Sequence, residues 1–119
     1  MTHVFVYGTL KRGGRNHRFI AAQQFLGEAR TPAGFTLYSL GRYPGMVRAP
    51  NDVAGVVGEI WAVDDACVTE LDRLEGLAEG LYERVTIILL PPFAETPAQT
   101  YLYLRDLSGR PAIGSVWRE

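Results

Sequence analysis

The chain has 119 residues, with 12 Lys and Arg against 13 Asp and Glu, which gives a formal net charge of −1 at pH 7. The length predicts a single domain over residues 1–119, and the balanced charge argues against a basic surface for nucleic acid or anionic membrane. One cysteine, Cys67, excludes an internal disulfide and a cysteine-rich zinc site. No apolar run approaches the roughly 20 residues of a membrane-spanning helix. We therefore expect a cytoplasmic protein without nucleic-acid or membrane partners. Its oligomeric state stays open, with a slight preference for a monomer.

The first half of the chain predicts a helix between two strands. The β-branched and aromatic run His3–Tyr7 is typical of a strand. Asn16 is the expected N-cap of a helix over residues 17–26, and Gly27 is placed to end it. Alternating apolar residues then predict a strand over Phe35–Leu40.

The second half predicts three strands, which cover residues 56–63, 83–90 and 99–104. Between the first two of them, a helix capped by Asp64 or Asp65 is expected to reach Glu75, with Gly76 as its terminator. The proline-rich stretch 91–97 joins the last two strands as a surface loop, and an irregular tail is expected from about residue 106.

Five strands and two short helices, joined mostly by connections too short for parallel crossovers, indicate an α+β fold. We expect a small mixed β-barrel with short flanking helices.

The second predicted helix places one acid on its apolar face. With about 100° between residues and Cys67 at zero, Leu71 falls near 40°, Val68 near 100° and Glu75 near 80°. Burial and the negative end of the helix dipole both raise the pKa of a carboxyl at that position. Glu75 is therefore a candidate proton carrier near neutral pH. The alternative is that the helix ends at Leu74 and Glu75 points to solvent.

A glycine-containing turn, Tyr7-Gly8-Thr9-Leu10, follows the first strand. Turns of this kind expose backbone N–H groups that bind anions. The spacing of Gly8 and Gly13 resembles that of a nucleotide phosphate loop, but the required Lys-Ser/Thr pair does not follow. A carboxylate ligand remains possible, in surroundings made positive by Lys11, Arg12 and Arg15, and a plain surface turn is the alternative. His3 and His17 lack a third ligand at metal-site spacing, so no metal site is expected.

Together, the segment Val4–Gly13, the block Leu71-Asp72-Arg73-Leu74-Glu75-Gly76 and the block Tyr82-Glu83-Arg84 resemble the γ-glutamylcyclotransferase-like superfamily. The resemblance is greatest to γ-glutamylamine cyclotransferases and their small bacterial relatives, and it runs from about Val4 to Leu104. It implies a small mixed barrel with flanking helices and an enzyme that needs neither cofactor nor metal.

The resemblance also implies roles for individual residues. The turn formed by Tyr7, Gly8, Thr9 and Leu10 would bind the α-carboxylate of a γ-glutamyl substrate through backbone N–H groups. Glu75 matches the essential acid, and Tyr82 and Arg84 match in type, with shaping roles at most. The implied reaction is a lyase-like, amide-cleaving acyl transfer: the α-amine attacks its own γ-carbonyl, which gives 5-oxoproline and a free amine. The leaving group is left open among a γ-glutamyl amine, an ε-lysyl isopeptide and another γ-glutamyl metabolite.

Two functions from other classes are weighed against the enzyme. One is a non-catalytic module that binds small carboxylates at the Tyr7–Leu10 turn, with Glu75 structural. The other is a protein-interaction domain that uses an exposed tail including Trp117.

Overall fold

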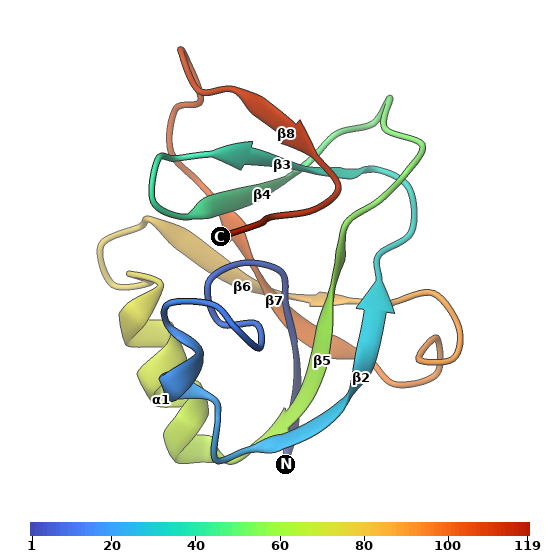
Figure 1. The fold of residues 1–119 in the computed structure, drawn as a ribbon, viewed down its shortest axis with the longest axis vertical. Coiled ribbons are helices and arrows are strands. Elements are labelled where there is room, and N and C mark those ends of the chain that lie inside the picture. The colour runs from blue at the N-terminus through green and yellow to red at the C-terminus, as the bar shows by residue number, and fades with distance from the viewer.

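The computed structural model describes residues 1–119 as eight strands, one α-helix and one short 3₁₀ turn (Figure 1). The helical parts are η1 (His17–Phe19) and α1 (Asp65–Leu74), which lie against one another. The strands are β1 (Thr2–Val6), β2 (Gln24–Arg30), β3 (Phe35–Ser39), β4 (Pro44–Arg48), β5 (Val57–Val63), β6 (Tyr82–Ile87), β7 (Ala98–Tyr103) and β8 (Ala112–Gly114). None of the helical segments has the length and apolar character needed to cross a membrane.

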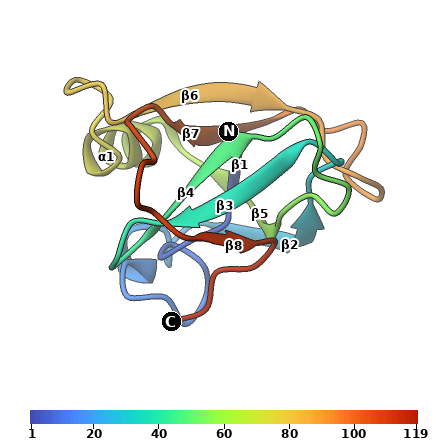
Figure 2. The same cartoon turned by 90° about the horizontal axis from the view of Figure 1, so that it is seen from above.

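All eight strands belong to one mixed sheet. Hydrogen-bonded neighbours follow the order β2-β5-β1-β7-β4-β3-β8, and β6 pairs with β7 outside this path. Strand β7 runs parallel to β1 and to β4, whereas the other pairs are antiparallel. Seen from above, β6 and β7 lie on the side of the molecule opposite to β8 (Figure 2). The expected α+β class is confirmed, but the sheet is not closed into the expected barrel, because β2 and β8 at its ends do not pair.

Strand β1 divides the hydrophobic core into two halves. Successive side chains of a strand point to opposite faces. Accordingly, Val4 and Val6 belong to a buried cluster that includes Leu71 of α1, whereas Phe5 and Tyr7 belong to a second cluster. Residues on both faces of β1 are therefore packed in the core, and this packing fixes the start of the turn that follows Tyr7.

The helix expected over residues 17–26 is wrong. Only η1 is helical, and the Asn16 side chain does not cap it. The chain then enters β2, which pairs with β5 and has a bulge between Phe25 and Gly27. The Phe25 ring packs against Trp61 with 5.3 Å between ring centroids. This tertiary contact and the pairing with β5 override a local helical pattern.

Besides β2, two further strands were not expected from the sequence. β4 begins at Pro44-Gly45, a pair that normally signals a turn, but proline is tolerated at the first residue of a strand. β8 lies in the tail expected to be irregular from about residue 106, and it pairs with β3. Trp117, which the protein-interaction alternative places in an exposed tail, is partly buried and packs on the second core cluster. The tail therefore folds back onto the domain.

Candidate active site

A cavity of about 290 Å³ lies where β1 ends, close to the C-terminal end of α1. Both elements of the expected site line it: the turn Tyr7–Leu10 and the acid Glu75. Further lining side chains come from β6, β7 and two loops, and they include Asn16, Tyr43, Tyr82 and Tyr101. The structure thus brings together residues that are more than 60 positions apart in the sequence.

Glu75 is the C-cap residue of α1 and keeps right-handed helical backbone angles. The next residue, Gly76, has a φ of 67°, and its N–H donates to the Arg73 carbonyl. The Leu77 N–H donates to the Asp72 carbonyl. These two bonds form a Schellman motif, in which glycine supplies the left-handed residue that ends the helix. The helix does end at Leu74, as the alternative required, but the capping motif keeps Glu75 on the wall of the cavity.

The environment of Glu75 makes it a candidate proton carrier. Its side chain has no hydrogen bond or ion pair within the chain, and burial raises the pKa of its carboxyl to about 7. No Asp, His, Lys, Arg or Cys lines the cavity beside it. A carboxyl with this pKa is ionised in part at neutral pH, so it can both accept and return a proton. Glu75 is the only group in the cavity suited to this task.

The turn after β1 offers unpaired hydrogen-bond donors to the same cavity. The backbone N–H groups of Gly8, Thr9 and Leu10 donate to no acceptor within the chain. Three consecutive free N–H groups are typical of a backbone anion site. Because the lining contains no Lys or Arg, these groups are the strongest means available for binding a carboxylate there.

Close packing and side-chain bonds fix the shape of this turn. A Cβ on Gly8 would lie 2.8 Å from the Pro44 ring, so the backbone comes closer to that ring than a residue with a side chain could. Asn16 holds the turn from the other side: its side-chain amide donates to Thr9 Oγ1 at 3.0 Å, and its N–H donates to the Thr9 carbonyl at 3.0 Å. Both contacts restrict how the N–H groups can move.

Three tyrosines form much of the remaining wall. Tyr7 Oη donates to the Tyr101 carbonyl at 2.6 Å, and Tyr82 Oη donates to the Pro44 carbonyl at 2.7 Å. Tyr101 Oη donates to Asp72 Oδ1 at 2.8 Å. Burial is the first cause that raises the pKa of each of these phenols, so all three stay protonated at neutral pH. They shape the cavity as neutral groups whose protons are already used in hydrogen bonds.

The basic residues near the turn do not act as the sequence suggested. Lys11 Nζ donates to the Trp117 carbonyl at 2.9 Å, and Arg12 Nε binds Glu59 at 2.9 Å. Arg15 pairs with Glu119. None of the three lines the cavity around Glu75; Lys11 and Arg12 instead lie beside Gly8 on the other side of the turn.

The resemblance also pointed to Tyr82 and Arg84, and only one of them lies in the cavity wall. Tyr82 lines the cavity, whereas Arg84 lies outside it and binds both carboxylate oxygens of Asp72, at 3.0 and 3.3 Å. Asp72 in turn accepts the Tyr101 hydroxyl, so Arg84 reaches the cavity only through these two residues.

Sequence reasoning missed part of the cavity wall. Asn16 was interpreted as a helix cap, and the sequence analysis assigned no element to Tyr43 and Pro44. The pairing of β4 with β3 and β7 places Tyr43 and Pro44 in the cavity wall, whereas Asn16 is placed there by its bonds to Thr9. No cluster of three or more His, Cys, Asp or Glu side chains is arranged to hold a metal ion.

The chain is similar to known proteins over most of its length. The family model described as gamma-glutamyl cyclotransferase, AIG2-like, matches residues 4–119. A Vibrio cholerae protein, named a gamma-glutamylcyclotransferase on a provisional basis, is 40% identical over 103 residues, which cover 84% of this chain and 80% of that protein. A gamma-glutamylaminecyclotransferase of Rattus norvegicus is 36% identical over 94 residues, 73% of this chain and 62% of its own.

A solved structure agrees with these matches. The solution structure of the Escherichia coli protein ytfP superimposes with a TM-score of 0.72 at 35% sequence identity, covering 98% of this chain and 95% of that one. Likeness of fold alone does not establish a function, but here the sequence family and the fold point the same way. The chain belongs to the gamma-glutamyl cyclotransferase, AIG2-like family.

Proposed function

We propose that the protein is a γ-glutamyl cyclotransferase that releases 5-oxoproline and a free amine, with Glu75 as general base and then general acid. The observation that carries the proposal is the pairing, on one cavity, of three unpaired N–H groups with a single half-buried carboxyl, whose pKa is raised by desolvation to about 7. Membership in the family supports the reaction class. The rat relative's name, gamma-glutamylaminecyclotransferase, supports a γ-glutamyl amine as the class of substrate.

The substrate has two charged groups that need different partners. Its α-carboxylate accepts hydrogen bonds from the N–H groups of Gly8, Thr9 and Leu10. Its α-ammonium then lies toward Glu75, the only anionic group in the lining. Because the amine and the γ-carbonyl belong to one molecule, the cavity needs only to fold the substrate so that the amine reaches the carbonyl carbon.

The reaction proceeds by proton transfer, ring closure and release. An ammonium group has no lone pair for attack, so Glu75 takes one of its protons. The amine nitrogen then forms a bond to the γ-carbonyl carbon, which closes a five-membered ring. The bond from that carbon to the leaving nitrogen breaks, and Glu75 returns the proton to the departing amine. The ring nitrogen still carries one proton more than a lactam, so the regenerated Glu75 carboxylate takes it and passes it to the released amine, which leaves as an ammonium. No water is consumed, and both protons lost by the α-ammonium end on the departing amine.

The cavity wall also bears on the leaving group. Tyr43 and Leu74 at its edge remain more than one-third exposed, and with Leu81 they form an apolar rim without a basic residue. A leaving group with its own carboxylate would find no cation there, and burying an unpaired charge is costly. We therefore propose a γ-glutamyl amine, rather than a γ-glutamyl amino acid, as the preferred substrate.

A matched pair of substrates tests both parts of this proposal. γ-Glutamyl-isoamylamine and γ-glutamyl-leucine differ only by the carboxylate on the leaving group. We expect 5-oxoproline from the amine, with a kcat/KM at least about tenfold above that of the leucine compound. Release of 5-oxoproline can be followed by chromatography beside a no-enzyme control.

The outcomes separate the reaction class from the substrate preference. Equal rates, or faster turnover of γ-glutamyl-leucine, would contradict the preference but support the reaction. No 5-oxoproline from either compound, together with binding of 5-oxoproline by the folded protein, would favour a carboxylate-binding module instead.

A further inference from the structure

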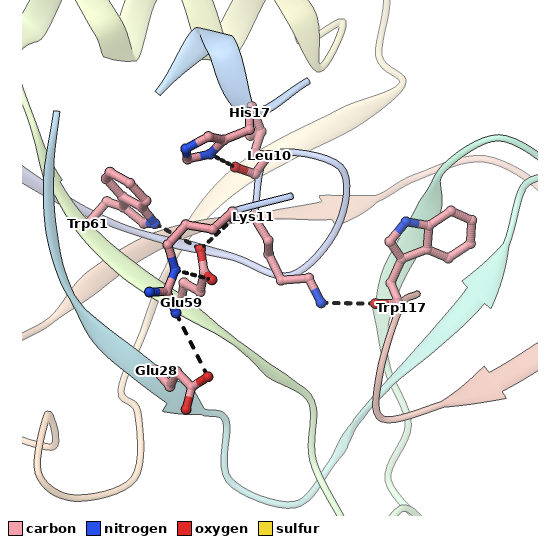
Figure 3. Close-up of polar contacts among 8 residues, drawn as sticks. Leu10, Lys11, His17, Glu28, Glu59, Trp61 and Trp117 are labelled. Atoms are coloured by element: carbon pink, nitrogen blue, oxygen red, sulfur yellow. Dashed lines mark hydrogen bonds and ion pairs between the residues drawn. The ribbon is translucent and has the colours of Figure 1, made fainter. Parts of the chain in front are cut away.

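The most deeply buried carboxylate of the chain, Glu59 on β5, lies outside the cavity described above. Its residue is only 6% exposed. Glu59 Oε1 accepts from the Arg12 backbone N–H at 3.1 Å and from Trp61 Nε1 at 3.2 Å, and Oε2 accepts from Arg12 Nε at 2.9 Å. Figure 3 shows Glu59 between the Trp61 indole and the chain that follows Leu10. Both carboxylate oxygens of Glu59 therefore accept hydrogen bonds. Two of the three bonds come from Arg12, which lies in the segment between β1 and η1.

The bond to the Arg12 N–H fixes the main chain itself. Arg12 lies two residues after Leu10, the last residue of the turn that lines the cavity. The Arg12 guanidinium is also placed by the Phe25 ring, 3.8 Å from its centroid. A change at Glu59 would therefore free both the side chain and the backbone at this point of the chain.

Other contacts hold the same segment from outside the cavity. The Leu10 carbonyl bonds to His17 Nδ1 at 2.9 Å, and Lys11 Nζ reaches the Trp117 carbonyl on the opposite side (Figure 3). The N–H groups of Gly8, Thr9 and Leu10 have no partner of their own within the chain. Their arrangement depends on these neighbouring anchors, and Glu59 is the only anchor that is both charged and buried.

We infer that Glu59 is a positioning residue, which fixes the backbone at Arg12 and so presents the Gly8–Leu10 N–H groups to the substrate carboxylate. This inference rests on the proposed function. The pair of half-exposed Arg12 with buried Glu59 is expected to add little net stability, so the role inferred for it is to fix one conformation of the turn. A turn held in its binding conformation before the ligand arrives loses less entropy on binding.

The position of Glu59 predicts which kinetic constants depend on it. Glu59 contacts neither the cavity nor Glu75. Its loss should weaken binding of the carboxylate while leaving proton transfer by Glu75 unchanged. The effect should appear in KM and in the Kd of the product, not in the pH dependence of kcat.

The test replaces Glu59 by glutamine. In Glu59→Gln the oxygen can still accept from a backbone N–H, but the new amide N–H₂ faces a second donor, the Arg12 guanidinium. We expect KM for γ-glutamyl-isoamylamine and Kd for 5-oxoproline to rise about tenfold, the value of one lost charge-assisted bond. We expect kcat to stay within about twofold, with an unchanged pH profile.

Two further variants keep the inference testable. Trp61→Phe removes only the indole bond to the same carboxylate and keeps an aromatic ring against His17 and Phe25, so it should lower thermal stability and leave KM unchanged. Arg12→Ala removes a side chain that is 47% exposed, which opens Glu59 Oε2 to water, and Glu59 keeps its bonds to the backbone N–H of residue 12 and to Trp61 Nε1. This variant should therefore fold even if Glu59→Gln does not. Arg12→Ala keeps the bond from the backbone N–H to Glu59, so KM should rise by about threefold, less than the rise expected for Glu59→Gln.

The outcomes are distinct. Unchanged KM and Kd in both Glu59→Gln and Arg12→Ala, beside an active wild type, would overturn the role of Glu59 alone. An equal rise in KM for Trp61→Phe would also overturn it, because the effect would then be general destabilisation. A folded wild type that neither releases nor binds 5-oxoproline would overturn the proposed function and this inference together.

Discussion

Glu75→Gln is expected to lower kcat for 5-oxoproline release by about 10²- to 10⁴-fold, the usual contribution of a general acid–base. Glutamine keeps the size of the side chain but can neither take the proton of the α-ammonium nor return it to the leaving amine. No other group in the cavity can replace it, because the phenols of Tyr7, Tyr82 and Tyr101 hold their protons at neutral pH.

Binding distinguishes a lost base from a lost site. The lactam nitrogen of 5-oxoproline is uncharged, so its carboxylate should bind the Gly8–Leu10 turn without help from Glu75. Calorimetry should therefore give a Kd for 5-oxoproline in Glu75→Gln that lies close to the wild-type value. Glu70→Gln is the matched control, because Glu70 is exposed on the same helix and pairs with Arg73. Equal activity in wild type and Glu75→Gln would exclude Glu75 as the base.

The same substitution is expected to stabilise the protein above pH 7. The carboxyl of Glu75 has an ordinary pKa of 4.5 and a pKa of about 7 in the fold, so the fold favours its neutral form. Wild-type stability from this group is therefore complete below pH 4.5, falls as the pH rises toward 7, and stays low above it. The gap between the two pKa values corresponds to about 3 kcal/mol, and glutamine, which is neutral at every pH, avoids this loss.

Urea unfolding at two pH values measures this effect. Between pH 4 and pH 8, the free energy of unfolding of Glu75→Gln should gain up to about 3 kcal/mol relative to wild type. Glu70→Gln, whose carboxylate is exposed, should show no such gain. A difference between Glu75→Gln and wild type that does not change with pH would contradict the burial argument for Glu75.

A residue that lowers stability at the working pH requires another reason to be present. Burial of an unpaired carboxyl is unfavourable for folding, but it gives that carboxyl a pKa suited to proton exchange. The Schellman motif at Gly76 and the packing of Leu71 hold Glu75 in this position. The proposed activity and the cost in stability thus come from the same side chain.

The sequence predicted the parts of the fold that are determined locally. α1 lies where the cap at Asp64 and the terminator at Gly76 placed it, because capping depends on residues within one turn of the helix. The helix over residues 17–26 was wrong because Phe25 packs on Trp61, far along the chain. β4 was missed because Pro44-Gly45 has turn chemistry, and only its pairing with β3 and β7 makes it a strand.

In the candidate site as well, features set by local sequence were predicted, and features set by long-range packing were not. Periodicity alone placed Glu75 on the apolar face of its helix, since that position depends on 100° steps from Cys67 and Leu71. The turn at Gly8 was recognised from its glycine and its place after a strand. Periodicity and spacing could not place Tyr43 or Asn16 in the cavity, because those positions depend on the packing of distant segments. For the same reason, periodicity and spacing gave no role to Glu59, because its partner Arg12 comes from the distant segment between β1 and η1.

The pH dependence of kcat/KM tests the central claim most directly, namely that a buried Glu75 carboxylate takes the proton of the substrate amine. With γ-glutamyl-isoamylamine, kcat/KM should rise tenfold per pH unit below the pKa of Glu75 and level off above it. The midpoint should lie near that pKa, at about 7. A rate that does not change between pH 5 and pH 8, or a midpoint near the ordinary carboxyl value of 4.5, would contradict the account.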